Sequence, residues 1–249
     1  MSKIELYGIK IDDLSLNEAV ERALAPAALP CWVVTPNAVM LDACRRDASL
    51  GRLLSCATLS LADGVGVLWA ARRVGRPLRE RVAGIDFGEA LLREAERREL
   101  RVFLLGGRDD ASERARERIC ARYPSLRVCG VHDGYFQKTG EEDARVTAMI
   151  QRAKPDILFV CFGFPLQERW IKAHLGDLNK VRVIAGLGGS IDVWAGKVKR
   201  APKWLSRMGL EWAWRMAREP RRLEHLPALF RCALIGNREK RQKNGEAKR

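Results

Sequence analysis

The sequence has no run of 18 uncharged apolar residues, no C-x-x-C pair and only 3 histidines. Because a spanning helix needs such an apolar run, we expect any association with a membrane to be peripheral. The N-terminal residues also lack the apolar stretch of a signal peptide. The 7 cysteines are scattered and odd in number, which is typical of reduced thiols in the cytosol rather than of a disulfide framework. These absences together predict a cytoplasmic protein.

Motifs for common cofactors are missing too. Neither G-x-G-x-x-G nor the P-loop pattern occurs, which disfavours a nicotinamide-dependent oxidoreductase and an ATP-binding enzyme. The histidines, at positions 132, 174 and 225, are far apart, and no D-x-D pair is present to hold a divalent ion on a nucleotide diphosphate. We therefore expect no metal and no other cofactor. If a diphosphate leaves in the reaction, backbone N–H groups, helix N-termini or Arg/Lys side chains must stabilise its charge.

Positive charge is abundant and unevenly distributed. The net charge is +14; residues 197–249 hold 16 Lys/Arg against 5 Asp/Glu, whereas residues 1–196 hold 29 against 26. A nearly neutral body with a basic end indicates an anionic partner that binds at that end. Nucleic acid, anionic lipid and diphosphate groups all satisfy this condition.

Short β-rich runs alternate with amphipathic helical patterns over residues 1–196, and glycine-containing turns follow most of the runs. This order predicts βαβ units, that is, a Rossmann-like α/β fold with a mostly parallel sheet between helices. After Gly196 only basic, Trp-rich helical patterns follow. We expect a basic helical appendage over residues 197–249, with a disordered end that lacks apolar anchors. The expected strands are 31–34, 58–61, 102–105, 126–131, 157–162 and 181–185, and two expected helices are 87–98 and 111–122.

In open α/β sheets, ligands bind beyond the carboxyl ends of the strands. Asp63 stands at such a position, because it follows an apolar run and precedes Gly64. A carboxylate there can act as a general base on a bound hydroxyl. It can equally be the N-cap of a helix that begins near Val65, and the sequence leaves both roles open. Acids with similar but poorer claims are Asp86, Asp133 and Asp192.

The appendage combines arginines with an apolar stripe. The arginines are spaced for one face of a helix, provided that Pro220 does not displace them, and guanidinium groups suit phosphate oxygens. One interpretation is an amphipathic element that lies on a membrane surface. The other is a helix that packs on the core and exposes a solvated basic side. The arginines are Arg215, Arg218 and Arg222, and the stripe consists of Trp204, Leu205, Met208 and Trp212.

These motifs together resemble the WecG/TagA/CpsF family, glycosyltransferase family 26. The similar segments run in order over about residues 4–235. They are T-P-N at 35–37, L-A-D-G-V-G at 61–66, R-V-A-G-I-D at 81–86, F-L-L-G-G at 103–107, H-D-G-Y-F at 132–136, F-G-F-P-L-Q-E-R-W at 162–170, G-G-S-I-D at 188–192, G-K-V-K-R-A-P at 196–202, L-E-W at 210–212 and E-P-R-R at 219–222.

The resemblance implies an inverting transferase that uses a UDP-sugar donor and a polyprenyl-diphosphate-linked acceptor, without a metal. TagA-type members transfer N-acetylmannosamine to lipid-linked N-acetylglucosamine for wall teichoic acid. Other members transfer N-acetylmannosaminuronic acid or glucose, so the sugar is left open, with N-acetylmannosamine as the first expectation. Such an enzyme would work at the inner face of the bacterial cell membrane, docked peripherally on anionic lipid through its appendage.

The resemblance also implies roles for individual residues. Asp63 matches the base proposed for the family, and Ala62 is a mild departure from a frequent proline. The family's C-terminal arginines close over the site and meet the diphosphate, although a further basic residue often stands where this chain has His225. The matching substrate-binding residues are Thr35, Asn37, Gln167, Arg215 and Arg222.

A nucleic-acid-binding protein is the alternative from a different class. It predicts recognisable binding modules or aromatic stacking platforms, and the sequence contains neither. The glycine-rich turns at 163–167 and 186–190 would also go unexplained. We therefore expect no nucleic acid partner. A monomer and a homo-oligomer both remain open.

Overall fold

A computed structural model describes residues 3–202, 204–205, 210–218, 224 and 226–234. The strands are β1 (Lys3–Leu6), β2 (Ile9–Asp12), β3 (Cys31–Val34), β4 (Leu59–Ser60), β5 (Arg101–Gly106), β6 (Arg127–His132), β7 (Ile157–Cys161) and β8 (Val183–Gly186). The helices are α1 (Leu16–Ala23), α2 (Ala38–Arg46), α3 (Ala48–Leu54), α4 (Val65–Arg73), α5 (Gly84–Arg97), α6 (Ala111–Arg122), α7 (Gly140–Ala153), α8 (Leu166–His174), α9 (Ser190–Trp194), α11 (Glu211–Arg218) and α12 (Leu226–Leu234).

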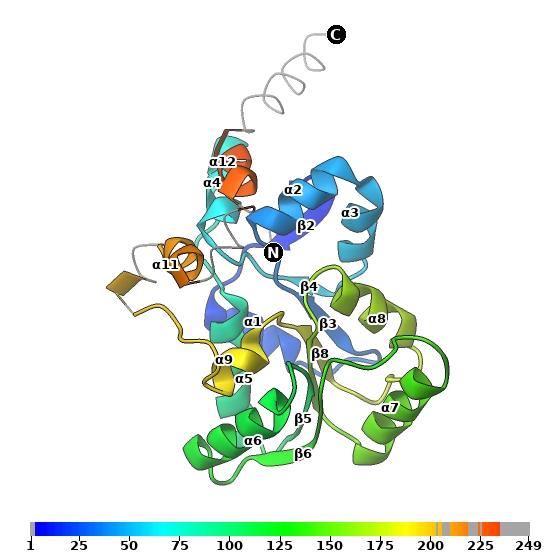
Figure 1. Ribbon diagram of the computed structural model, residues 1–249. Helices are drawn as coiled ribbons and strands as arrows, with labels where there is room; N and C mark the ends of the chain where they lie inside the picture. Colours follow the sequence, from blue (N-terminus) through cyan, green and yellow to red (C-terminus); the bar gives the residue numbers. More distant parts are fainter. Residues whose placement is uncertain (1–2, 203, 206–209, 219–223, 225, 235–249) are drawn as a thin grey trace.

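The centre of the protein is a six-stranded sheet with the order β4-β3-β8-β7-β5-β6. Every neighbouring pair in it is parallel, and helices cover both faces, as Figure 1 shows. The expected Rossmann-like α/β fold is therefore confirmed. Strand β3 is followed in the chain by β4 at one edge of the sheet, and β5 is followed by β6 at the other edge. Strands β7 and β8 lie between β3 and β5. In such a topology the ligand site is expected at the carboxyl ends of these central strands.

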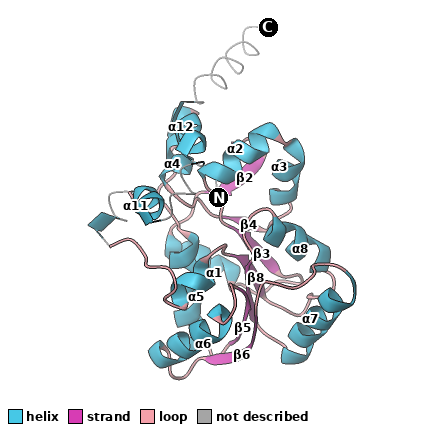
Figure 2. Ribbon diagram, in the orientation of Figure 1, coloured by secondary structure: helices cyan, strands magenta, loops and turns pink. Residues whose placement is uncertain are grey.

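Burial on both faces explains why the strands read as continuous apolar runs rather than as alternating ones. Residues 102–105 of β5 and 157–160 of β7 are all 0% exposed. One core cluster lies under α1, α5, α6 and α9, and the second lies under α2, α4, α7, α8 and α12. The two layers are seen in Figure 2, where the strands stand between the helices.

The N-terminal hairpin was not among the expected strands. β1 and β2 pair antiparallel, and Tyr7 and Gly8 between them both have positive φ, 52° and 76°. The apolar positions alternate here because only one side of the hairpin is buried: Ile4, Leu6, Ile9 and Ile11 are 0–4% exposed. This alternation around a turn with glycine is the signal that could have found the hairpin.

The described part of the C-terminal segment is helical and packs on the body. α12 lies against α2 and α4, and Leu229 and Cys232 are buried in the second core cluster. Among the described residues after Gly196 there is no strand, and no helix anywhere in the described chain is long and apolar enough to cross a bilayer. The division at Gly196 stays a prediction, and the expected disordered end lies outside the described residues.

Candidate active site

Thr35 and Asp63 lie just beyond the carboxyl ends of β3 and β4, and β8 is the neighbour of β3 on its other side. The backbone N–H of Asp63 donates to the carbonyl oxygen of Pro36 at 2.9 Å, which joins the turn after β4 to the turn after β3. The Thr35 hydroxyl, 8% exposed, donates to the carbonyl oxygen of Gly186 at 3.4 Å. Parallel strands thus bring together residues that are far apart in the sequence.

Asp63 is not the cap of the helix that follows it. The N-cap of α4 is Gly64, with φ 92° and no side-chain capping bond. Glycine suits this position because other residues rarely adopt such a φ. The capping interpretation is therefore wrong, and the half-buried Asp63 carboxylate lies at the mouth of the sheet. Its role as general base stays a prediction.

Asn37 has a structural task of its own. Its Oδ1 accepts hydrogen bonds from the backbone N–H groups of Val39 and Met40, at 3.0 and 3.1 Å, and so caps α2. Asparagine is among the best N-cap residues. Since Oδ1 is engaged, Asn37 would bind a substrate by donating from its Nδ2 group.

Gln167 lies beneath two glycine turns. Its Oε1 accepts from the backbone N–H groups of Gly163 and Gly188, at 3.3 and 3.0 Å, and so joins the turns after β7 and β8. Its Nε2 donates to Oε1 of Glu168 at 2.7 Å. Glu168 is 0% exposed, and this burial raises the pKa of its carboxyl group, which favours the neutral form. Gln167 itself is 4% exposed, and its direct contact with substrate stays a prediction.

Replacing Gln167 with leucine should leave the N–H groups of Gly163 and Gly188 without their acceptor. We expect the free energy of unfolding to fall by about 1–3 kcal/mol and the donor KM to rise. Urea unfolding and donor titration measure the two effects. Gln151→Leu is the control, because Gln151 is exposed and donates one bond to the carbonyl of Asp177. Equal effects of the two substitutions would contradict a special role for Gln167.

A cavity of about 670 Å³ lies at the carboxyl ends of β5, β6, β7 and β8. Its volume is in the range of sites for nucleotide-sized ligands. Glycines form much of its wall, so backbone atoms come close to the space inside. The glycines are Gly107, Gly134, Gly163, Gly188 and Gly189, and the polar side chains that argue for a ligand are Arg108, Tyr135, Lys138 and Asp192.

Two cations line this cavity. Lys138 Nζ donates to the carbonyl oxygens of Gly134 and Phe136, both at 2.7 Å, and lies 3.5 Å from the centre of the Phe136 ring. Burial lowers the pKa of Lys138. Arg108 Nε donates to the Tyr135 hydroxyl at 3.1 Å, and this bond raises the pKa of Arg108. The cavity thus combines cations, backbone and an aromatic ring, groups that suit a nucleoside diphosphate.

The turn after β8 connects the cavity to Asp63. The carbonyl oxygen of Gly186 accepts the hydrogen bond of the Thr35 hydroxyl, and Gly188, two residues later, lines the cavity. A ligand that extends from the cavity past this turn would approach Thr35 and Asp63. The candidate active site therefore has two adjoining parts, a cavity for a large ligand and a polar end with a carboxylate.

The other sequence candidates have varied outcomes. Of the weaker acids, only Asp192 lines the cavity; Asp86 pairs with Arg200, and Asp133 accepts from the N–H of Tyr135 at 2.6 Å. Arg215 lies in α11, but the position of its side chain is outside what the structure describes. Arg222 and His225 also lie outside the described residues. Their predicted contacts with a diphosphate stay predictions.

Arg108 and Lys138 were not predicted as site residues from the sequence. Arg108 follows the G-G turn after β5, and Lys138 stands two residues beyond the H-D-G-Y-F motif. A basic residue close behind a strand-end motif is the signal that could have found them. In the part of the chain that the structure describes, no group of three or more His, Cys, Asp or Glu side chains could hold a metal ion.

A parallel α/β sheet with a large cavity that several polar side chains line, and with a carboxylate at its carboxyl edge, defines a Rossmann-like ligand-binding protein. The model of the glycosyl transferase WecG/TagA/CpsF family matches residues 4–244. The chain belongs to this family, as the motifs in its sequence indicated.

Two relatives are similar over most of their length. A protein of Bacillus subtilis (strain 168) is 35% identical over 211 residues, which are 85% of this chain and 80% of the relative. A protein of Staphylococcus aureus (strain MRSA252) is 31% identical over 232 residues, 92% of this chain and 89% of the relative. Both are named N-acetylglucosaminyldiphosphoundecaprenol N-acetyl-beta-D-mannosaminyltransferase.

Proposed function

We propose that this protein transfers N-acetylmannosamine from a UDP-sugar to N-acetylglucosaminyl-diphosphoundecaprenol, with inversion at the anomeric carbon. The single observation that carries the proposal is the end of β8 with the turn that follows it: Gly186 bonds to Thr35, and Gly188 and Gly189 line the 670 Å³ cavity. The family and the names of the two relatives support the choice of reaction and of both substrates.

The donor's nucleotide occupies the cavity in this proposal. The exposed Tyr135 ring, 68% accessible, offers a surface on which the base can stack, and Arg108 and Lys138 attract the diphosphate. Backbone N–H groups of the glycine turns supply further donors. The sugar then extends past Gly188 towards the polar end of the site.

Asp63 acts on the acceptor. Its carboxylate removes the proton of the acceptor hydroxyl while that oxygen attacks the anomeric carbon from the face opposite UDP. The C–O bond to the diphosphate breaks, and UDP leaves with the bonding electron pair. Its negative charge is stabilised by N–H groups and by the cations of the cavity, joined by Arg215 and Arg222 from the C-terminal segment. Holding two large substrates in line supplies much of the remaining acceleration.

The lipid part of the acceptor stays in the membrane, so the protein must bind at the membrane surface. The exposed Trp204 and Phe230, 61% and 54% accessible, and the excess of Lys/Arg after Gly196 suit a peripheral contact with anionic lipid. We place the protein at the inner face of the bacterial cell membrane on this ground.

A donor panel tests the proposal. Purified protein is incubated with a short-chain lipid-diphosphate N-acetylglucosamine acceptor and UDP-linked N-acetylmannosamine, N-acetylmannosaminuronic acid or glucose. We expect transfer from UDP-N-acetylmannosamine alone, with turnover unchanged in excess EDTA because the cations that neutralise the diphosphate are side chains. Transfer from another donor would correct the sugar. Loss of turnover in EDTA, restored by Mg²⁺ or Mn²⁺, would refute the metal-independent mechanism.

A further inference from the structure

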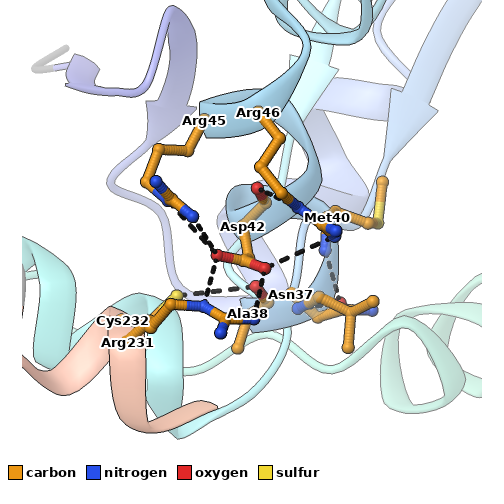
Figure 3. A network of polar contacts seen from close by, with 9 residues as sticks. Asn37, Ala38, Met40, Asp42, Arg45, Arg46, Arg231 and Cys232 are labelled. Carbon is orange, nitrogen blue, oxygen red and sulfur yellow. Dashed lines mark hydrogen bonds and ion pairs between the residues drawn. The ribbon is translucent and has the colours of Figure 1, made fainter. Parts of the chain in front are cut away.

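Asp42 of α2 is a buried carboxylate in contact with three arginines, one of which comes from the distant helix α12 (Figure 3). Its side chain is 0% exposed, whereas those of Arg45, Arg46 and Arg231 are 39%, 63% and 44% exposed. Arg45 and Arg46 belong to the same helix as Asp42. The pair of Asp42 with Arg231 instead joins two parts of the chain that are 189 residues apart.

Arg231 makes the best bonds to this carboxylate. Its Nε donates to Oδ1 at 2.9 Å and its Nη2 to Oδ2 at 2.8 Å, one bond to each oxygen. Arg45 reaches only Oδ1, at 3.3 Å from both of its donors. A guanidinium that bonds both carboxylate oxygens forms the stronger and more directional pair.

The charge of Asp42 depends on these arginines. Burial alone raises the pKa of Asp42, but the hydrogen bonds and charge of Arg231, followed by those of Arg45 and Arg46, outweigh it and hold the pKa below its ordinary value. Asp42 is therefore ionised at neutral pH, and a buried ionised group requires its partners. The need of ionised Asp42 for Arg231 therefore favours the conformation in which α12 packs on α2 and α4.

The docked α12 lies where α2 and α4 begin. A Cβ atom on Gly66, in the first turn of α4, would be 2.7 Å from Cβ of Ala38 and 3.0 Å from Cδ1 of Leu229. The Cys232 thiol is 3.5 Å from the Ala38 carbonyl oxygen. The three helices are thus in close contact next to Asn37, which caps α2, and just after the turn that carries Asp63.

Helix α11 is tied to the body as well. Glu211 of α11 pairs with Arg81 at 3.3 Å, and Arg81 lies in the turn that leads into α5.

We infer that Arg231 is a positioning residue for glycosyl transfer: by pairing with Asp42 it fastens α12 against α2 and α4, beside the turns that carry Asn37 and Asp63. The inference rests on the proposed function. Arg231 touches no substrate in this arrangement, and it acts only through the placement of α12 beside these two turns.

The test uses five full-length variants: Arg231→Ala, Arg231→Lys, Asp42→Asn, the double variant of Arg231→Ala with Asp42→Asn, and the control Arg45→Ala. The control removes one arginine from Asp42 but leaves α12 attached, because Arg45 lies on the same helix as Asp42. All five should fold: Asp42 keeps at least two arginines in each single arginine variant, and where Asp42 is replaced the partly exposed arginines can be solvated by water. Hydrogen exchange of residues 226–234 reports the attachment of α12, and transfer kinetics report its consequence.

In Arg231→Ala and Asp42→Asn, amide exchange in α12 should accelerate by about tenfold or more because the helix detaches more often. The kcat should fall by about tenfold or more, with the donor KM within about twofold, because the donor cavity lies away from α12. The Lys variant should be intermediate, and combining Arg231→Ala with Asp42→Asn should add little further loss, as for two residues of one interaction. Arg45→Ala should behave like the wild type.

Unchanged exchange in Arg231→Ala, an unchanged kcat, or an equal loss in Arg45→Ala would overturn the inference. If the wild-type protein transfers no sugar at all, the proposed function fails, and the exchange measurement still gives a separate answer. Faster exchange in Arg231→Ala and Asp42→Asn, but not in Arg45→Ala, would then still support the attachment of α12 through this pair, and equal exchange would refute it.

Discussion

Replacing Asp63 with asparagine should lower kcat by about 10²–10⁴-fold, because an amide cannot take the proton of the acceptor hydroxyl. The substitution keeps the size and shape of the side chain. It removes no helix cap, since the cap of α4 is Gly64. Folding and UDP affinity should therefore survive, as measured by thermal unfolding and by calorimetry, while sugar transfer to a short-chain acceptor is nearly lost.

Asp47→Asn is the matched control for this experiment. Asp47 is exposed and caps α3 by accepting from the N–H of Ser49 at 2.8 Å. Asparagine caps a helix as well as aspartate does, so the same chemical change should be harmless there. Near-normal turnover of the Asp63→Asn enzyme would show that Asp63 is not the base.

Ending the chain at Leu234 should weaken binding to anionic vesicles by about a hundredfold or more, because each Lys/Arg near the surface contributes about 1 kcal/mol. Residues 235–249 hold six Lys/Arg and two Glu. The shortened chain keeps α12 and the pair of Arg231 with Asp42, so transfer in detergent should be unchanged. Co-sedimentation with phosphatidylglycerol vesicles at low and high salt measures the loss.

A chain of full length with glutamine in place of Arg238, Lys240, Arg241 and Lys243 is the control, because it removes charge but not length. It should lose vesicle binding to a similar degree. Strong, salt-sensitive binding by both altered chains would mean that the membrane contact lies before residue 235.

A cut after Gly196 is a harsher change. It removes Arg215, Arg222 and α12 together, so we expect transfer and vesicle binding to be lost. The structure adds that α2 and α4 would expose the apolar surface now covered by Leu229 and Cys232, which should lower the free energy of unfolding. UDP binding by this core must therefore be measured beside its stability. Normal transfer by the core would make the appendage a scaffold only.

Much of the fold could be predicted because its signals are local. The expected helix 111–122 is α6 as observed, and each expected strand of the large sheet corresponds to an observed one within two residues at either end. Apolar runs flanked by glycine turns specify strands and helices through short-range backbone preferences. The β1–β2 hairpin was missed because its alternating run is short and lies outside the βαβ pattern.

The candidate site was predicted in part. Strand-end turns and the family motifs indicated Thr35, Asn37 and Asp63, and the parallel sheet places all three at one edge. The sequence left open whether Asp63 caps a helix, and backbone geometry at Gly64 excludes that role. The tasks of Gln167 were not predictable, because Gly188 comes within reach of it only when β7 and β8 lie side by side.

By itself, the sequence determined the fold class, the family, the positions of the polar turns and the basic end, since each depends on neighbouring residues or on motif order. Tertiary structure alone decided the cavity, the cations Arg108 and Lys138 in its wall, and the pairing of Asp42 with Arg231. These features depend on contacts between distant segments. Strand order and helix packing set such contacts, and no short window of sequence contains both partners.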